Sequence, residues 1–328
     1  MLNPKLNEGS SISRKIDGKD LFLKYSVYIV LVVLVIAFSM ISPLFLSQAN
    51  IGNFFRQVPT VGIATVGITM LLITGRVDLS AGSIAAFAGT AAVFLAIKGF
   101  SPPVVILAAI AIGAFWGFIN GFFIVKFKLD SFILTLGTDY MIRGIILFLT
   151  NGIYVKGVPD WFYSLSNTKV GVNFIFTNTL VFAAVVVVLT YVMNHTRFGR
   201  YCYAVGSNQE AARLSGINIQ KHLVKVFMLE GALAALAGVL LMSNLNVGAP
   251  SEAAGVGLFA MAAAIIGGAA FSGGVGNIPG AVVGIFTLEI FRNGLAILGL
   301  NSFIQQAVTG GIIVVAVVVD YYRRTRSR

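Results

Sequence analysis

Five ionisable residues lie inside the long apolar stretches of this 328-residue chain, where polar chemistry would take place in a hydrophobic medium. They are Asp139, Arg143, Glu230, Glu289 and Arg292. A charge at the centre of a bilayer costs about 2.5–3.5 kcal/mol or more unless it is paired or hydrated. Each of these residues is therefore a candidate for a functional role.

Two of these residues share a helix face with a hydroxyl group. Thr135, Asp139 and Arg143 recur at intervals of four, which places them along one side of a helix. Asp139 can pair with Arg143, and Glu289 can pair with Arg292. This arrangement favours a polar lining for the path of a solute, to which other polar residues of the apolar stretches would contribute. The predicted substrate-pathway residues are Asn120, Thr135, Asp139, Arg143, Asn293 and Gln305.

The alternative interpretation is that these groups hold helices together without touching a solute. For Arg143 we favour a structural or gating role over direct contact. Asp78, in GRVDLSAGS (75–83), is predicted to lie in a cytoplasmic turn between two spans and to cap the next helix. His195 and His222 are expected at the surface, and no metal site is predicted.

A long basic and polar segment, residues 194–225, separates two otherwise apolar halves. Within it, EAARLSGI (210–217) predicts a short amphipathic helix whose small residues permit close docking and which Gly216 ends. Glu210 and Arg213 on its polar side suit salt bridges at a protein interface. The chain has no G-x-x-x-x-G-K-[ST] phosphate-binding loop. A nucleotide that drives this protein would therefore be bound by another polypeptide.

The elements that must position these residues are membrane-spanning helices. Hydrophobic residues make up 57% of the chain and charged residues only 11%, and a span needs about 20 mainly apolar residues. We therefore predict an all-α polytopic membrane protein with about ten transmembrane helices. The predicted spans are roughly 25–46, 57–75, 79–97, 102–125, 131–150, 174–193, 224–245, 256–272, 278–298 and 302–320. The corresponding divisions are a cytoplasmic segment (1–24), a transmembrane domain (25–320) with a cytoplasmic loop (194–223), and a basic tail (321–328).

The distribution of charge predicts the orientation of the chain. With the N-terminus inside, 17 of the 23 Lys and Arg residues fall on the cytoplasmic side, and only Arg56, Lys98, Lys156 and Lys169 fall outside. This is the positive-inside pattern, so both termini are predicted to be cytoplasmic. Topology accounts for the net charge of +11, and no nucleic-acid partner is expected.

Two rows of glycine indicate an internal repeat. The rows are Gly113, Gly117 and Gly121 on the fourth span, and Gly276, Gly280 and Gly284 on the ninth. Glycine at this spacing lets two helix backbones approach closely. The two spans cross in opposite directions, so the pattern favours an inverted repeat of spans two to five and seven to ten.

Several sequence blocks resemble the membrane subunit of bacterial ABC importers for monosaccharides, the ribose/galactoside/xylose permease family. The blocks are ITGRVDLSAGSIAA (73–86), FILTLGTDYMIRGI (132–145), HTRFGRYCYAVGSNQEAARLSGINI (195–219), AAAIIGGAAFSGGVGNIPGAVVG (262–284) and NGLAILGLNSFIQQ (293–306). The resemblance implies a permease of the bacterial cytoplasmic membrane for a pentose- or hexose-like sugar. It further implies a second permease copy or a close paralogue, a cytoplasmic ABC ATPase and an extracytoplasmic substrate-binding protein as partners.

The resemblance also implies roles for particular residues. Those that match the loop engaging the ATPase are Glu210, Ala211, Ala212 and Gly216, and Arg213 lies within the same stretch. Arg143, Asn293 and Gln305 match polar span positions of the family. No cofactor is expected in this chain, because ATP and magnesium would be held by the partner ATPase.

Other kinds of transporter remain as alternatives. A related ABC permease would carry a nucleoside or another small polar solute. An ion-coupled secondary transporter would use Asp139, Glu230 or Glu289 as its titrating group. The polar segment 194–225 argues against the second of these, because such a transporter has no motor to engage.

Overall fold

A computed structural model describes residues 18–171 and 174–325, which form thirteen helices. The described residues contain two isolated β-bridges and no strand. The prediction of an all-α protein is therefore confirmed. Residues 1–17 of the predicted N-terminal segment and residues 326–328 of the predicted tail lie outside the described residues.

Ten of the described helices overlap the ten predicted spans, with bounds that differ by several residues in some of them. They are α1 (Gly18–Ile41), α2 (Gln48–Ile73), α3 (Ala81–Ile97), α4 (Pro102–Phe127), α5 (Ser131–Thr150), α7 (Thr177–His195), α10 (Ile219–Leu245), α11 (Val256–Ile266), α12 (Ile278–Ile297) and α13 (Ser302–Thr325). Three shorter helices lie in the connections. They are α6 (Asp160–Asn167), α8 (Arg197–Ser207) and α9 (Gln209–Leu214).

Six of these helices are long and apolar enough to cross a bilayer: α2, α4, α5, α7, α10 and α12. The apolar parts of α1, α3 and α11 are shorter. The predicted span 256–272 was too long, because α11 ends at Ile266 and Gly267 and Gly268 follow in a turn. Gly268 has a φ of +95°, which a helix interior does not accommodate.

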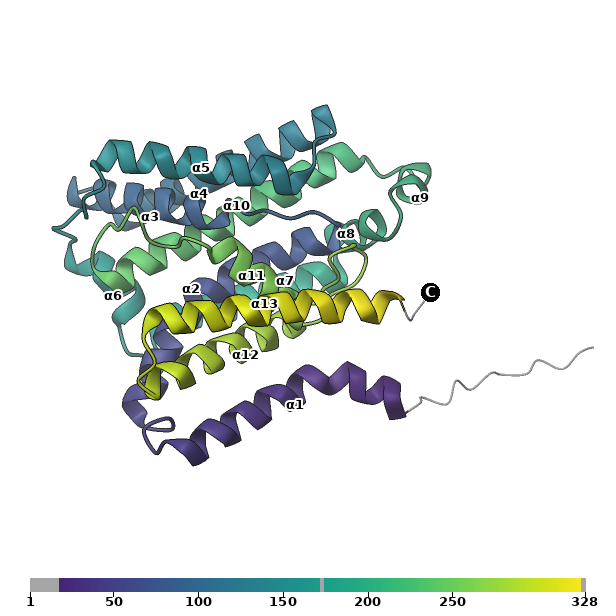
Figure 1. Ribbon diagram of the computed structural model, residues 1–328. Coiled ribbons are helices and arrows are strands. Elements are labelled where there is room, and N and C mark those ends of the chain that lie inside the picture. The colour runs from purple at the N-terminus through teal and green to yellow at the C-terminus, as the bar shows by residue number, and fades with distance from the viewer. Residues whose placement is uncertain (1–17, 172–173, 326–328) are drawn as a thin grey trace, which may run out of the picture.

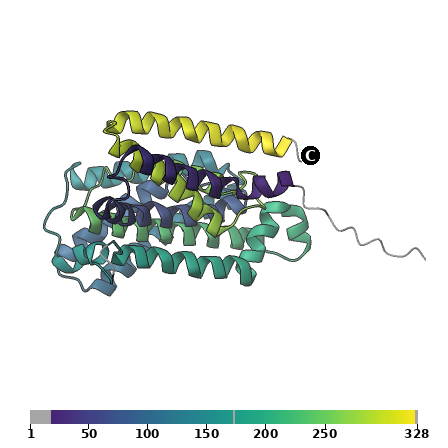
Figure 2. The ribbon, with the colours of Figure 1, turned by 90° about the horizontal axis from the view of Figure 1, so that it is seen from below.

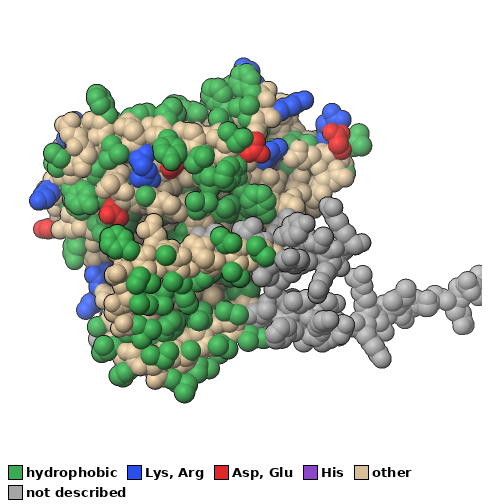
Figure 3. Space-filling view, in the orientation of Figure 1, with side chains coloured by type: hydrophobic (Ala, Val, Ile, Leu, Met, Phe, Trp, Pro, Cys, Tyr) green, Lys and Arg blue, Asp and Glu red, His purple; other side chains and the backbone are tan. Residues whose placement is uncertain are grey.

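The helices lie roughly side by side and build a bundle with two distinct ends (Figure 1). One end carries α8 and α9 together with the start of α1 and the end of α13, and the other carries α6. α2 and α10 are the most deeply buried of the six long apolar helices, whereas α13 lies along the outside of the bundle (Figure 2). Apolar side chains are spread over the face seen in Figure 3, among few charged ones.

The two central helices, α2 and α10, which are the most buried of the six long apolar helices, are each packed against two helices of the other half of the chain. α10 packs against α3 and α4, and α2 packs against α11 and α12. In the first half α3 contacts α4 and α5, and in the second half α11 contacts α12 and α13. α2 and α10 also contact each other, so they link the two halves.

Irregular segments follow both central helices and enter the bundle. Segment 74–80 joins α2 to α3, and segment 246–255 joins α10 to α11. A Cβ atom on Gly257 of α11 would meet the backbone of Leu79 at 2.8 Å, and a Cβ atom on Gly82 of α3 would overlap the carbonyl oxygen of Ala253. Each segment therefore packs tightly against the helix that follows the other.

The glycine rows act as predicted on α4 and only in part on α12. Cβ atoms on Gly113 and Gly117 would overlap carbonyl oxygens of α10, so only glycine permits this approach of the two helices. Gly280 and Gly284 of α12 lie equally close to the end of α11. The placement of Gly276 on the same helix was wrong, because α12 begins at Ile278 and Gly276 belongs to the preceding turn, with a φ of +143°.

Candidate functional site

Helix α9 is the exposed tip of the polar segment, and both its ends are capped. The Asn208 side chain accepts a hydrogen bond from the backbone N–H of Ala211 at 3.0 Å. At the other end Gly216 has a φ of +83°, and its N–H donates to the carbonyl oxygen of Arg213 at 3.0 Å. Because glycine adopts this backbone conformation without strain, the predicted glycine stop is confirmed.

One face of α9 is anchored and the other is free. Ala212 is buried against Val205 and Leu223, whereas Ala211 and Gly216 are exposed. Glu210 and Arg213 form an exposed ion pair with a separation of 2.7 Å. An exposed pair of this kind adds little to stability, so both groups are available to a partner.

Leu214 completes this surface, and the sequence analysis did not identify it. Its side chain is 84% exposed at the end of α9. A leucine in a polar loop beside a charged pair is the signal that was available in the sequence. The free face of α9 therefore combines one large apolar side chain with two opposite charges.

Helix α8 connects this surface to the ends of other helices. A Cβ atom on Gly206 would overlap the carbonyl oxygen of Ile73, the last residue of α2. The Tyr203 hydroxyl donates to the carbonyl oxygen of Gly276 at 2.9 Å. The backbone N–H of Gly274 donates to the same Ile73 oxygen at 2.8 Å. A movement of α8 would therefore be transmitted to the end of α2 and to the turn before α12.

Beneath α8 lies a buried contact between Cys202 and His222, whose Sγ and Nε2 atoms are 3.4 Å apart. His222 also packs against the rings of Phe198 and Tyr201. Burial lowers the pKa of His222 to about 4, and the charge of Lys225 contributes in the same direction. The expectation that His222 is a surface residue was wrong, because aromatic rings of α8 cover it, whereas His195 is exposed as expected.

A second group of polar residues lies inside the bundle, around Asp78. One Asp78 oxygen accepts hydrogen bonds from the backbone N–H and the hydroxyl of Ser80, both at 2.6 Å. The Asn120 amide donates to the other Asp78 oxygen at 3.1 Å and to the Ser80 hydroxyl at 2.9 Å. Asp78, Ser80 and Asn120 are all buried.

Helix α5 holds the same segment from another side. The Thr135 hydroxyl accepts from the backbone N–H of Leu79 at 3.0 Å, and the Ser131 hydroxyl accepts from that of Val77 at 3.2 Å. The turn that contains Asp78 therefore packs against α4 and α5 and is buried. The carboxylate is 1% exposed, and it binds the N–H of Ser80, the residue that precedes α3, from within the protein.

Further along α5, Asp139 and Arg143 form the predicted pair, with a separation of 3.8 Å. Both side chains are partly exposed, at 22% and 18%. Arg143 also donates to the backbone carbonyl of Glu252 at 3.4 Å, in segment 246–255. At this part of α5, a charged pair is therefore partly exposed at the surface of the chain and also contacts segment 246–255.

The remaining predicted pathway residues lie elsewhere. The Asn293 amide of α12 exchanges two hydrogen bonds of 2.9 Å with Asn50 of α2. Gln305 donates to the carbonyl oxygen of Leu300 at 2.8 Å, at the start of α13. The six predicted residues thus divide into separate contacts and do not form one continuous lining within a single chain.

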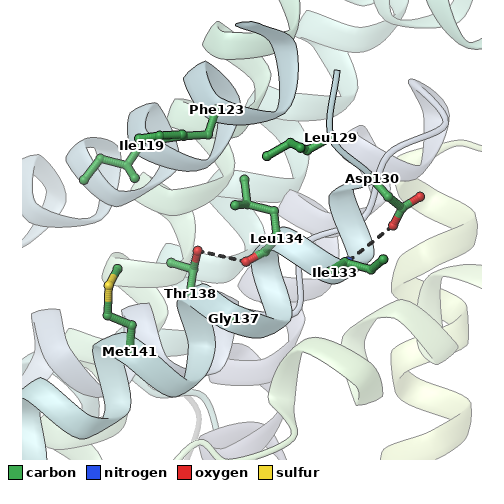
Figure 4. Close-up of a pocket in the computed structure, with 9 residues that line it drawn as sticks. All are labelled: Ile119, Phe123, Leu129, Asp130, Ile133, Leu134, Gly137, Thr138 and Met141. Carbon is green, nitrogen blue, oxygen red and sulfur yellow. Dashed lines mark hydrogen bonds between the residues drawn. The ribbon is translucent and has the colours of Figure 1, made fainter. Parts of the chain in front are cut away.

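An open groove of about 470 Å³ lies between α4 and α5 (Figure 4). Its walls are apolar apart from Asp130 and Thr138. Asp130 already accepts from the backbone of Phe132 and Ile133, and Thr138 donates to the carbonyl oxygen of Leu134 at 3.0 Å. Since its polar groups are satisfied within α5, the groove suits an apolar neighbour better than a polar solute.

Comparisons with known proteins give matches along most of the chain. The family described as "Branched-chain amino acid transport system / permease component" matches residues 50–317. The ribose import permease protein RbsC of Escherichia coli strain K12 is 36% identical over 299 residues, which cover 89% of this chain and 92% of that protein. No solved structure matches the chain.

Two further relatives have similar coverage. The xylose transport system permease protein XylH of Haemophilus influenzae is 30% identical, over 92% of this chain and 97% of that protein. The L-arabinose ABC transporter permease protein AraH of Azospirillum brasilense is 32% identical, over 94% of this chain and 91% of that protein.

Proposed function

Because this chain belongs to the family of branched-chain amino acid transport system permease components, we propose that it is the membrane subunit of an ATP-binding-cassette importer for a monosaccharide. It lies in the bacterial cytoplasmic membrane, as its apolar helices and its relatives indicate. The three relatives described above are named for ribose, xylose and arabinose. A five-carbon sugar is therefore the favoured cargo.

The observation that carries this proposal is the surface of α9. It is exposed, capped at both ends, and seated on α8 and α10 through Ala212. Leu214, Glu210 and Arg213 supply an apolar anchor and two charges, which is a suitable combination for a protein interface. ATP and magnesium are bound by the ATPase that docks here, and this chain acts as a transport subunit without an ATPase site of its own.

The contacts of α8 would transmit a movement of the ATPase to the membrane-spanning helices. ATP binding in the partner moves α9, and α8 moves with it. Because α8 contacts Ile73 and the turn before α12, this movement reaches α2 and α12. Reorientation of these helices would open the path alternately to each side of the membrane.

The transmembrane domain is an inverted repeat of ten spans with both termini in the cytoplasm. The corresponding pairs are α2 with α10, α3 with α11, α4 with α12, and α5 with α13. The matching packing order in the two halves supports this correspondence. So does the irregular segment that follows each central helix.

The sugar passes along the face of α5 that carries Asp139 and Arg143, between two copies of the chain. These side chains are partly exposed in one chain, which leaves them accessible to a solute. Asn120 and Thr135 support the path indirectly, since they hold segment 74–80. A substrate-binding protein delivers the sugar at the opposite end of the bundle from α9.

Substitutions on α9 test the docking role. Glu210→Lys and Leu214→Ala are each expected to abolish co-purification of the ATPase and sugar uptake, while the protein remains in the membrane. Lys169→Glu is the matched control for ATPase association, because it changes an exposed charge at the other end of the bundle, beside α6. Normal ATPase association in both α9 variants would refute the role of this surface.

Uptake into proteoliposomes tests the cargo. The permease, reconstituted with its ATPase and its binding protein, is expected to accumulate radiolabelled ribose, xylose or arabinose only when ATP is supplied inside. Radiolabelled nucleosides and branched-chain amino acids are tested in parallel. Accumulation of a nucleoside in preference to every sugar would contradict the monosaccharide assignment.

A further inference from the structure

Two carboxyl groups meet at the centre of the bundle, and the proposed transport mechanism assigns neither a role. Glu230 of α10 is fully buried, and Asp78 of segment 74–80 is 1% exposed. Their side chains lie within hydrogen-bonding reach of each other. Glu230 also packs against α2, because a Cβ atom on Gly67 would lie 3.4 Å from its Cγ.

The two carboxyl groups have very different surroundings. Asp78 accepts three hydrogen bonds, from the N–H and hydroxyl of Ser80 and from the amide of Asn120. Neither oxygen of Glu230 has a hydrogen-bond donor, and the amide oxygen of Asn120 also has no partner. Asp78 is thus placed as a stabilised carboxylate, whereas Glu230 lacks any group that would stabilise its negative charge.

Charged groups of the surrounding elements do not compensate this pair. Those in or next to the elements that pack on α10 are Arg56, Arg76, Lys98, Lys126, Lys128, Asp160, Arg197, Arg200, Glu210 and Arg213, and those of α10 itself are Lys221, His222 and Lys225. Among the described residues, none of these cations forms an ion pair with Glu230 or Asp78. Two adjacent carboxylates without a cation would repel each other strongly in a medium of low dielectric constant.

We propose that Asp78 and Glu230 form a buried proton-binding site, in which Glu230 holds one proton at neutral pH and donates it to the carboxylate of Asp78. The proton gives Asp78 a fourth donor and gives Glu230 its only hydrogen bond. It fastens segment 74–80 to α10, as Thr135 and Ser131 fasten the same segment to α5. The bound proton stays on the protein and is not part of the cargo.

A proton suits the site better than a metal ion. Among the described residues, the oxygen atoms of this cluster belong to Asp78, Ser80, Asn120 and Glu230, and Asp78 already accepts from three donors. Calcium takes six to eight oxygen ligands and magnesium takes six, often with water, which this buried site does not supply. Sodium is the remaining competitor, and the experiments below include it.

Infrared spectroscopy of the purified full-length protein in detergent tests the proposal. At neutral pH the wild type is expected to show the carbonyl band of a protonated carboxyl group, shifted in heavy water. Glu230→Gln should remove this band while retaining an N–H donor for Asp78, and hence the fold. Glu289→Gln is the matched control, because Glu289 is buried but ion-paired with Arg292 at 3.1 Å, and it should leave the band unchanged. A spectrum of Glu230→Gln identical to that of the wild type would overturn the proposal.

Thermal unfolding provides a second measurement. The unfolding midpoint of the wild type is expected to fall between neutral and alkaline pH, as the shared proton is lost, and the midpoint of Glu230→Gln should fall less. Sodium chloride, compared with choline chloride at equal ionic strength, should not raise either midpoint selectively. A sodium-specific rise in the wild type that Glu230→Gln abolishes would overturn the proton assignment in favour of a cation site.

Discussion

At the scale of single residues, four of the five ionisable residues that the sequence analysis placed in the spans form ion pairs. Asp139 lies 3.8 Å from Arg143, and Glu289 lies 3.1 Å from Arg292. Pairing avoids the cost of an isolated charge in an apolar medium, so the loss of one partner leaves the other uncompensated. The sequence spacing was sufficient to predict both pairs, because both are local to one helix.

Neutralising the Asp139–Arg143 pair should therefore be non-additive. Asp139→Asn and Arg143→Gln are each expected to lower transport and the unfolding midpoint. The double variant is expected to lose less than the sum of the two, with a coupling free energy of roughly 0.5–3 kcal/mol. Transport assays and thermal unfolding in detergent measure this, and independent additive losses would count against the pairing.

His222 is expected to make the stability of the folded protein decrease at acid pH. Its folded-state pKa is about 4, against an ordinary value of 6.5, so the unfolded chain takes up a proton at a higher pH than the folded chain. Its contribution to stability is thus complete above about pH 6.5 and is lost as the pH falls towards about 4. The loss is a few kcal/mol at most, since one pKa unit corresponds to about 1.4 kcal/mol.

His222→Gln removes the titrating group and keeps a polar atom for Cys202. The slope of unfolding midpoint against pH below neutrality should be shallower in this variant than in the wild type. His195→Gln is the control, because His195 is exposed and should leave the slope unchanged. Equal slopes in His222→Gln and the wild type would contradict the assignment.

At the scale of elements, a glycine residue allows α8 to pack closely against its neighbours. Gly206 lies so close to Ile73 and Gly274 that a methyl group would overlap their backbone atoms. Gly206→Ala is therefore expected to displace α8, to cost about 1–3 kcal/mol of stability, and to reduce ATP-driven uptake more than ATPase binding. Unfolding, uptake and co-purification together measure this.

Gly99→Ala, in the turn between α3 and α4, is the matched control for the substitution at Gly206. Its φ of +83° strains an alanine, but no atom lies within 4 Å of the added Cβ. The expected cost is about 1–2 kcal/mol from backbone strain alone, with α8 still in place. If both variants reduced uptake in equal proportion to their loss of stability, the linkage through Gly206 would be refuted.

At the scale of the whole molecule, hydropathy predicted where the helices are but not how deeply the connections between them are buried. A helix lies in each of the ten predicted spans, because apolar length is a local property of the sequence. The burial of Asp78 and His222 depends instead on contacts with distant residues such as Asn120 and Phe198. No periodicity in the surrounding sequence indicates those contacts.

Contacts between distant residues also explain why the predicted pathway residues do not lie together. Asn293 pairs with Asn50 of another helix, and no spacing rule relates two residues so far apart in the chain. Leu214 was missed for a different reason, since a single apolar residue in a polar loop has meaning only once its side chain is known to be exposed.

The orientation of the whole molecule leads to a labelling experiment that its single cysteine makes possible. Cys202 is buried, so the wild type should react little with a membrane-impermeant maleimide and provides the control. Lys169→Cys is expected to be labelled only from the extracytoplasmic side, in spheroplasts, and Glu210→Cys only in inside-out vesicles. The physical reason is that α9 lies at the opposite end of the bundle from α6 (Figure 1), and the excess of Lys and Arg assigns the α9 end to the cytoplasm. Labelling of both variants from the same side would contradict the proposed topology and, with it, the docking of an ATPase on α9.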